Sequence, residues 1–420
     1  MSGVAKKLVR HRESMAQAEL DDAVRRHEMY LSGRLGGQRA LLAYRDLSGL
    51  DLKGRRLNDA DFTGAFLVGA QMAGINLNSA TLFGANMTRA DLREAVLVRA
   101  DLRGAVLRGA NLDGADLFNA DLRDGRLGQR VRMGVIEEVS IADGSAADLE
   151  GARMVNANLT QAKLSGSVAA HTDFTDAVMR HCKLVRADLH NANLTGADLS
   201  SADLSGANLK GANLRNAIMT NAILYHTETN GADMTGALTK MPAGHKLFEL
   251  TASIEELIER HERWSTSGGV EGEPLDLSGY DLREAVQLSG KSLPALTAKG
   301  AVFSGLILDG IGLQGAQLQG ADFRSCRLNR ADLRGINLSD ARLTNADLRD
   351  ADLGPLALPG GRLVVSVLER AEARHVDFRG ANLSRAVLSG ADLAAANMTG
   401  AQLDDIDIEG AKLTGIVGLA

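Results

Sequence analysis

The chain has 420 residues, of which 45% are apolar and 3% aromatic, so it is long enough for one large domain or several smaller ones. The 47 Lys and Arg against 53 Asp and Glu give a net charge of −6, which excludes a strongly basic nucleic-acid binder. Two cysteines exclude a disulfide framework, and the lack of a long apolar run or signal peptide predicts a soluble, cytoplasmic protein without membrane contact.

The first segment, residues 1–46, is predicted to be an arm followed by a short helix. Its apolar stripe lies at helical spacing: Leu20, Ala23, Val24, His27 and Tyr30. A Gly-rich stretch follows and marks the end of the helix.

From Leu47 a large apolar residue recurs at every fifth position. One frame runs from Leu47 to Leu127, a second from Leu149 to Met234, and a third from Leu288 to Leu413. A period of five matches neither an amphipathic helix nor a long strand. It predicts a very short strand plus a bend, repeated without pause.

Within one unit, such as Ala110–Gly114, the small residue and the Leu are two positions apart. Extended backbone places these two on one side and Asn111 and Asp113 on the other. The fifth residue can turn the chain to the next side. Stacked coils of this kind bury Ala and Leu and form a rigid, filled rod.

The repeated A(D/N)LxG pattern resembles the pentapeptide-repeat family, for example at Ala90–Leu92, Ala197–Leu199 and Ala346–Leu348. The resemblance implies an all-β solenoid, a right-handed quadrilateral β-helix with four pentapeptides per coil. We expect a first array over residues 47–238 and a second over residues 277–420.

The repeat weakens at two places inside the arrays. Near residues 130–144 the frame slips, which predicts an irregular looped coil within one continuous rod, and the loop is either a recognition element or a tolerated insertion. The second place is Leu356–Arg374, next to Pro355 and Pro359, where the repeat pattern is weak. Here we expect a distorted coil or, as the second choice, a short inserted helix.

A larger break, residues 239–276, contains Ser253–Glu256, a capping box, and then apolar residues at helical spacing through His261 and Trp264. Aligning His27 with His261 superposes both helices and their Gly-rich loops, and places Asp46–Gly49 on Asp276–Gly279. The chain is therefore predicted to be a tandem duplication. Each helix should cap the N-terminal end of its own rod, with Tyr30 and Trp264 packed on the first coil.

The sequence offers no catalytic, cofactor-binding or metal-binding motif, so no enzyme activity, cofactor or metal is predicted. His27 and His261 lie on apolar stripes without a second ligand at metal-binding spacing, which favours a structural role. Cys182 and Cys326 occupy the small inward position and are expected to be buried and inert. Asp residues with Arg two positions later, as at Asp91 and Arg93, are expected to form exposed ion pairs.

Two functions remain open. The favoured one is a rigid, non-enzymatic scaffold for an unknown protein partner. The alternative, which the family resemblance implies, is a DNA mimic that binds a topoisomerase, as in gyrase inhibition or quinolone protection. Residues 47–127 hold ten acids and ten bases, residues 149–240 hold eight of each, and residues 277–420 hold 17 acids and 15 bases. Neither array therefore carries the sustained negative charge that mimicry needs.

Stacked apolar residues in outward positions are the candidate interaction surface. Contact with the N-terminal arm or the other rod would explain them equally well. We expect three sets: Val96, Val98 and Phe118; Phe66, Val68 and Val106; and Ile218, Ile223 and Tyr225. No helix follows the C-terminal coil to cover it, which predicts a homodimer or end-to-end association through that coil.

Overall fold

The computed structural model describes residues 14–130, 136–140, 146–240 and 244–419. The chain divides into two compact units, Met1–Lys240 and Met241–Ala420. Each unit has a hydrophobic core of its own, which runs along the inside of one repeat array. Within the described ranges, no helix combines the length and the apolar character needed to cross a bilayer.

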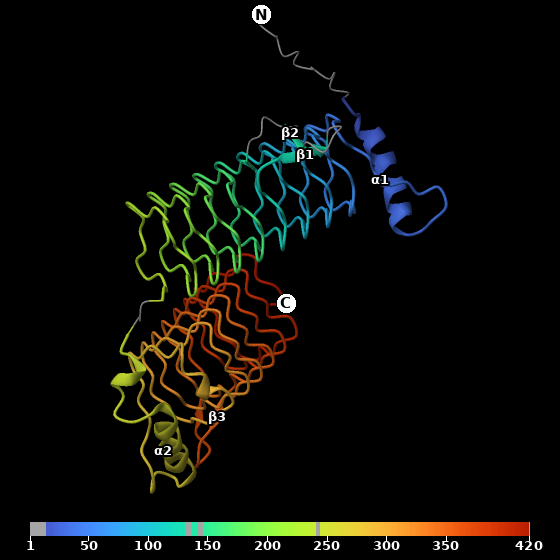
Figure 1. Ribbon diagram of the computed structural model, residues 1–420. Coiled ribbons are helices and arrows are strands. Elements are labelled where there is room, and N and C mark those ends of the chain that lie inside the picture. The colour runs from blue at the N-terminus through green and yellow to red at the C-terminus, as the bar shows by residue number, and fades with distance from the viewer. Residues whose placement is uncertain (1–13, 131–135, 141–145, 241–243, 420) are drawn as a thin grey trace, which may run out of the picture. The chain divides into compact units, whose positions relative to one another are not determined.

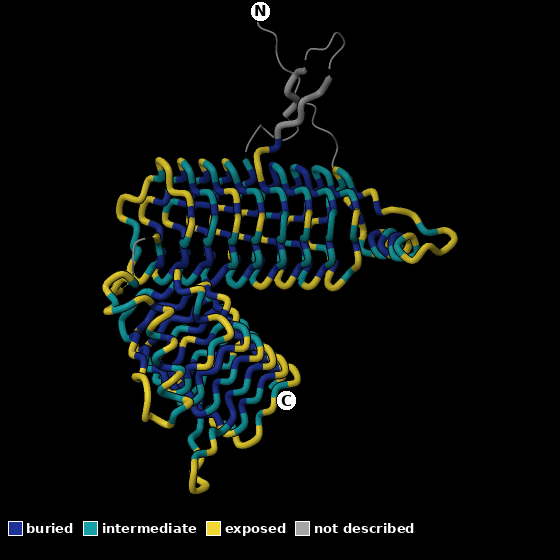
Figure 2. Tube along the Cα trace, turned by 60° about the horizontal axis from the view of Figure 1, so that its bottom comes forward, coloured by how far each residue is buried: buried dark blue, intermediate teal, exposed yellow. Residues whose placement is uncertain are grey.

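The first unit is a stack of coils joined by parallel backbone pairs. The residue before each apolar centre pairs with the residue twenty positions later, as in Asp46 with Phe66 and Asn76 with Val96. Five residues per side and twenty per coil make four sides, the right-handed quadrilateral β-helix. Leu97 and Ala95 are fully buried, and Figure 2 shows buried positions in register from coil to coil.

The polar residue before each centre has a local structural task. The Asp61 carboxylate accepts the backbone N–H of Thr63 at 2.9 Å, and the amide oxygen of Asn76 accepts that of Asn78 at 3.0 Å. This side-chain turn supports the bend at each corner, because Asp and Asn readily bond the backbone two residues on. The repeated Asp and Asn are therefore explained by the fold.

An antiparallel hairpin interrupts the first array. Strand β1 (Arg126–Arg130) pairs with β2 (Ile136–Ser140), while the ladder continues from Val106 directly to Asp148. The prediction that Leu127 is the last centre of a regular coil is therefore wrong, because Leu127 lies in β1 and the ladder has already left this part of the chain. Of the segment expected to be irregular, residues 131–135 and 141–144 lie outside the described residues.

Helix α1 (Gln17–Leu31) lies at the start of the first array (Figure 1). It buries Leu20, Val24 and His27. The residue before it, Ala16, provides no side-chain cap, but Met15 donates its N–H to the carbonyl of Asp46 at 3.0 Å. The segment preceding the helix thus adds one pair to the edge of the first coil.

The second unit repeats this order with more interruptions. It contains a 3-10 turn η1 (Leu247–Glu249), helix α2 (Ile254–Thr266), a 3-10 turn η2 (Val286–Leu288) and strands β3 (Leu356–Ala357) and β4 (Leu363–Val364). The Ser253 hydroxyl accepts the N–H of Glu256 at 3.2 Å, as the capping box predicts. The sequence predicts Leu288 as a regular centre, but the residue lies in η2. Here the coil is one residue longer than usual, because Asp281 pairs with Val302 and not with the residue twenty positions later.

Strands β3 and β4 form a second hairpin at a corner of the second array. The ladder pairs Asn337 with Val367, thirty residues later, and then returns to its regular spacing of twenty residues. A hairpin therefore takes the place of the distorted coil and of the inserted helix expected here. The Leu356 side chain lies over Gly335, where a Cβ atom would stand 2.7 Å from that of Leu356.

Candidate functional site

The first apolar set lies together on one side of the first array, which we name the Leu57 face after its centres Leu57, Leu77, Leu97 and Leu117. Val96 pairs with Asp116 in one row, and Arg99 donates its N–H to the carbonyl of Phe118 at 2.9 Å. Val98 and Phe118 are therefore neighbours in the other row. Val96, Val98 and Phe118 are all partly exposed, so they form a small apolar patch on successive coils.

The second set lies on the opposite side, the Leu47 face, with centres Leu47, Leu67, Met87 and Leu107. Asn86 separates Phe66 from Val106 in the ladder, so the set is not continuous. Val68 is 36% exposed, and Phe66 and Val106 are half-buried. The Leu47 face therefore carries isolated apolar side chains, which are common on protein surfaces.

The third set does not form one surface. Ile218 follows Asp198 in the ladder of the Leu57 face and is only 2% exposed, so its prediction as a surface residue is wrong. It stands between Asp198 and Leu238, which are also buried. Ile223 and Tyr225 lie on the adjacent side, in the last coil of the first array, and are 48% and 69% exposed.

His27 is a structural residue that joins α1 to the first coils. The N–H of Ala40 donates to its Nδ1 at 3.0 Å, so the hydrogen of the neutral ring is on Nε2, which donates to the carbonyl of Asn58 at 2.9 Å. Burial lowers the pKa of His27 and favours this neutral form. Both ring nitrogens are thus occupied by backbone groups.

His261 makes the same pair of bonds in the second unit. Its Nδ1 accepts the N–H of Leu275 at 2.8 Å, and its Nε2 donates to the carbonyl of Pro294 at 3.0 Å. Burial lowers its pKa as well. Neither histidine has a nitrogen available for a metal or a substrate, which agrees with the structural role predicted for them.

The aromatic residues beside these two histidines lie in different surroundings. Tyr30 is 47% exposed and lies against the His27 ring, with centroids 5.8 Å apart, so the expectation that it packs on the first coil is wrong. The Gly-rich loop packs closely on the helix turn that carries Tyr30. A Cβ atom added to Gly37 would lie 2.3 Å from the backbone nitrogen of Tyr30. Trp264 is partly buried and lies 5.3 Å from the His261 ring.

The two histidines also correct the alignment of the repeats. Ala40 and Leu275 each precede a centre by two residues, so Leu42 corresponds to Leu277. The alignment from sequence alone places Leu47 on Leu277, which is one pentapeptide too far. Successive units are so similar that only the tertiary contact with the histidine fixes the register.

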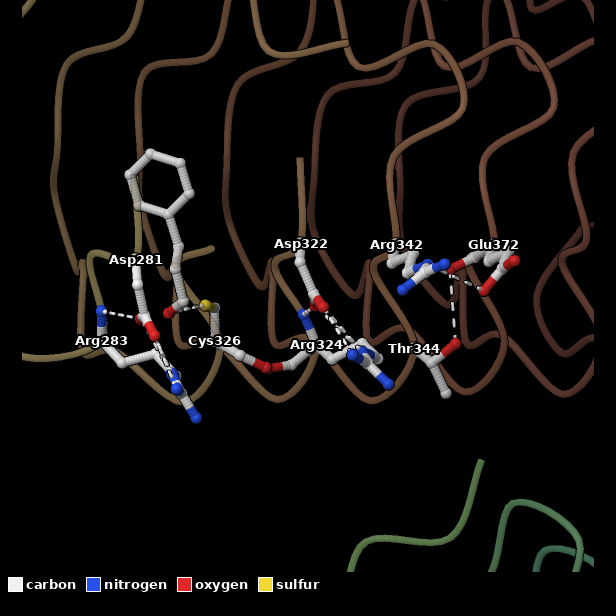
Figure 3. A network of polar contacts seen from close by, with 10 residues as sticks. Asp281, Arg283, Asp322, Arg324, Cys326, Arg342, Thr344 and Glu372 are labelled. Atoms are coloured by element: carbon white, nitrogen blue, oxygen red, sulfur yellow. Dashed lines mark hydrogen bonds and ion pairs between the residues drawn. The ribbon is translucent and has the colours of Figure 1, made fainter. Parts of the chain in front are cut away.

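Ion pairs follow the outward rows of both arrays. Arg93 and Asp91 are 2.7 Å apart, and the hydrogen bond from Arg93 holds the pKa of Asp91 below its usual value. Figure 3 shows three pairs of the second array: Asp281 with Arg283, Asp322 with Arg324, and Arg342 with Glu372. These carboxylates have cationic partners beside them, which does not favour general acid–base catalysis.

The cysteines and the acidic residues offer no reactive centre within the described ranges. Cys182 and Cys326 are buried, and each thiol donates to a backbone carbonyl, of Ala162 and Phe303 respectively. Burial raises the pKa of both thiols, so neither forms the nucleophilic thiolate at neutral pH. Among the residues that the structure describes, no three His, Cys, Asp or Glu side chains are arranged to hold a metal ion.

Comparison with known proteins identifies the repeat. The family model "Pentapeptide repeats" matches eight copies, and the matched ranges together cover residues 46–124, 145–238, 299–354 and 366–415. No curated protein matches the chain.

Several solved structures are similar. Rfr23, a pentapeptide repeat protein from the cyanobacterium Cyanothece 51142, is 31% identical over 32% of this chain and 89% of its own, with a TM-score of 0.27. QnrB1, a plasmid-mediated fluoroquinolone resistance protein, is 20% identical over 48% of this chain and 92% of its own, with a TM-score of 0.25. HetL from the cyanobacterium Nostoc, a protein involved in heterocyst differentiation regulation, is 20% identical over 96% of both chains, with a TM-score of 0.18.

Proposed function

Because the chain belongs to the pentapeptide-repeat family, we propose that it is a non-enzymatic, rigid scaffold that binds a protein partner. The observation that carries this proposal is the apolar patch of Val96, Val98 and Phe118 on successive coils of the Leu57 face. The continuous backbone ladder holds these side chains at fixed spacing. A binding surface that is already ordered loses little conformational entropy when a partner docks.

The surroundings of the patch suit a protein partner. Asn76 and Asp116 flank Val96 in its row, and Asp116 also accepts the N–H of Phe118 at 3.0 Å. An apolar centre with a polar rim is typical of protein interaction sites. Three side chains make a small contact, so we expect them to be the centre of a larger interface.

Phe118→Asp tests this surface, with Val68→Asp as the matched control on the opposite Leu47 face. We expect affinity capture with crosslinking from the native cell to lose a partner with Phe118→Asp and to retain it with Val68→Asp. Circular dichroism should show both variants folded, because both positions point outward. If every captured partner is unchanged with Phe118→Asp, the patch is not a binding site.

DNA mimicry is the second candidate, and the ion pairs disfavour it. Arg93, Arg103 and Arg123 lie within 2.7 Å of the Asp residues two positions before them, so the acidic rows are locally neutralised. A mimic that competes with polyphosphate needs uncompensated negative charge. A gyrase supercoiling assay separates the two functions: inhibition or protection at micromolar protein would favour mimicry.

A further inference from the structure

His171 and His190 lie side by side on successive coils of the first array. His171 donates its backbone N–H to the carbonyl of His190 at 3.1 Å, so the ladder fixes the separation of the two residues. Their rings meet edge to face, with centroids 5.2 Å apart and an interplanar angle of 77°. His171 is exposed, and the side chain of His190 is 38% exposed. The fold therefore holds two imidazole rings together at a place that an ion can reach.

Asp188 orients the ring of His190. Its carboxylate accepts the Nδ1–H of His190 at 2.8 Å, and the side-chain amide of Asn208 donates to the same oxygen at 2.9 Å. Because Nδ1 carries the hydrogen, the neutral ring presents an unprotonated Nε2. A carboxylate bonded to the far nitrogen is the common support of a metal-binding histidine, since it fixes the tautomer and the direction of the ring. His27 and His261 differ, because backbone groups occupy both of their nitrogens.

The surroundings leave the remaining ring nitrogens available. Among the residues that the structure describes, none forms a hydrogen bond with Nε2 of His190 or with the ring of His171. Gly151 precedes His171 in its corner row, and a Cβ atom added there would meet nothing within 4 Å. Lys210, the next residue in the row of His190, is paired with Glu228 of the following coil at 2.5 Å. Its charge is therefore compensated away from the two rings.

The spacing of the rings suits a tetrahedral metal ion. A zinc–nitrogen bond of about 2.0–2.1 Å puts the ion about 3.2 Å from the centre of each ring. Two ring centres 5.2 Å apart then correspond to an N–Zn–N angle of about 109°, the tetrahedral value. A metal that prefers right angles between its ligands, such as Cu²⁺, would need ring centres about 4.5 Å apart.

We propose that His171 and His190 form a surface site for Zn²⁺, with Asp188 holding the His190 ring in place. Two water molecules complete the four ligands. Two protein ligands hold zinc less tightly than the four of a structural zinc site, so the dissociation constant is expected to be micromolar. His190 follows a centre of the Leu47 face, opposite the apolar patch, so the site does not depend on the proposed scaffold function.

Calorimetric titration of the full chain with Zn²⁺ tests the site. His171→Asn has a matched control in His181→Asn, because both histidines are exposed corner residues with φ of 56° and 55°, and Asn tolerates this conformation. The wild type and His181→Asn should bind one Zn²⁺ with equal affinity. His171→Asn and His190→Gln should each raise the dissociation constant more than about tenfold. Asp188→Asn, which keeps an acceptor at this position, should raise it about tenfold.

A second measurement uses Co²⁺ as a probe of the geometry. Co²⁺ bound to the wild type should show the intense visible absorption of a tetrahedral ion, and His171→Asn should abolish it. A wild type that binds no Zn²⁺ at about 100 μM, well above the range of micromolar dissociation constants, overturns the proposal. So does a site that His171→Asn or His190→Gln leaves intact, or one that His181→Asn weakens equally.

Discussion

At the residue scale, the buried histidines explain why each helix stays attached to its array. His27 and His261 each satisfy one backbone donor and one backbone acceptor that would otherwise be buried without a partner. A leucine of similar size would leave both groups unpaired, at about 1–3 kcal/mol for each group. The histidine thus stabilises the cap through its two nitrogens as well as through its packing.

This arrangement predicts that both caps lose stability in mild acid. Burial lowers the pKa of His27 and His261 in the folded state, whereas the unfolded chain keeps a value of about 6.5. The unfolded state therefore binds more protons in that window. The stability that the two neutral histidines contribute is fully present above about pH 6.5 and is lost as pH drops below this value. Denaturant titrations between about pH 7.5 and 5, above the usual carboxyl range, measure the effect.

The matched variants are His261→Leu and, as a control, His226→Leu, because His226 is exposed. His261→Leu should destabilise the second unit at neutral pH and remove this part of its pH dependence. His226→Leu should change neither property. A second unit whose stability in His261→Leu still falls by the same amount below about pH 6.5 would contradict the prediction.

At the element scale, the corner residues decide where the coil is interrupted. Ala295, Gly315 and Gly335 occupy one row of corners and all have φ between +58° and +69°. Pro355 falls at the next position of this row. The proline ring fixes φ near about −65°, so the chain leaves the coil there and forms the β3–β4 hairpin.

Removing the hairpin tests this explanation. Deletion of residues 356–365 restores the five-residue spacing between Leu353 and Leu368. Combined with Pro355→Gly, it should leave the second array folded, because glycine adopts a positive φ without strain. The same deletion with Pro355 retained should lower the free energy of unfolding by more than about 1 kcal/mol. Thermal unfolding by circular dichroism distinguishes the two; equal stability would contradict the role given to Pro355.

At the scale of the whole molecule, the chain consists of two units with separate cores and separate helix caps. The core that begins at Met15 and the core that includes Leu277 share no residue. The single tryptophan, Trp264, belongs to α2 and lies against His261. Its fluorescence therefore reports on the second cap alone.

The separate cores predict independent unfolding. His27→Leu should lower the midpoint of the part of the circular dichroism transition that belongs to the first unit. It should leave the midpoint of the Trp264 fluorescence transition unchanged. His261→Leu should shift the fluorescence transition. If His27→Leu shifts the fluorescence midpoint as much as His261→Leu does, the two units unfold as one cooperative body.

The sequence by itself determined the repeat, the inward and outward positions and both capping helices. These features depend on contacts within a few residues: alternation in extended backbone puts Ala95 and Leu97 inside, and Ser253 caps α2 locally. The positions of Val96, Val98 and Phe118 on one side of the array could also be predicted from the sequence. A coil of twenty residues stacks positions that are four pentapeptides apart.

Only the tertiary structure decided where the ladder skips an insertion and what each end contacts. Leu127 fits the pattern but lies in β1, Ile218 is buried although it points outward, and Tyr30 stays exposed at the helix end. The alignment of Leu42 with Leu277 likewise required the contacts of His27 and His261. Pentapeptides are nearly interchangeable, so local sequence cannot specify which unit stacks on which, and long-range hydrogen bonds make that choice.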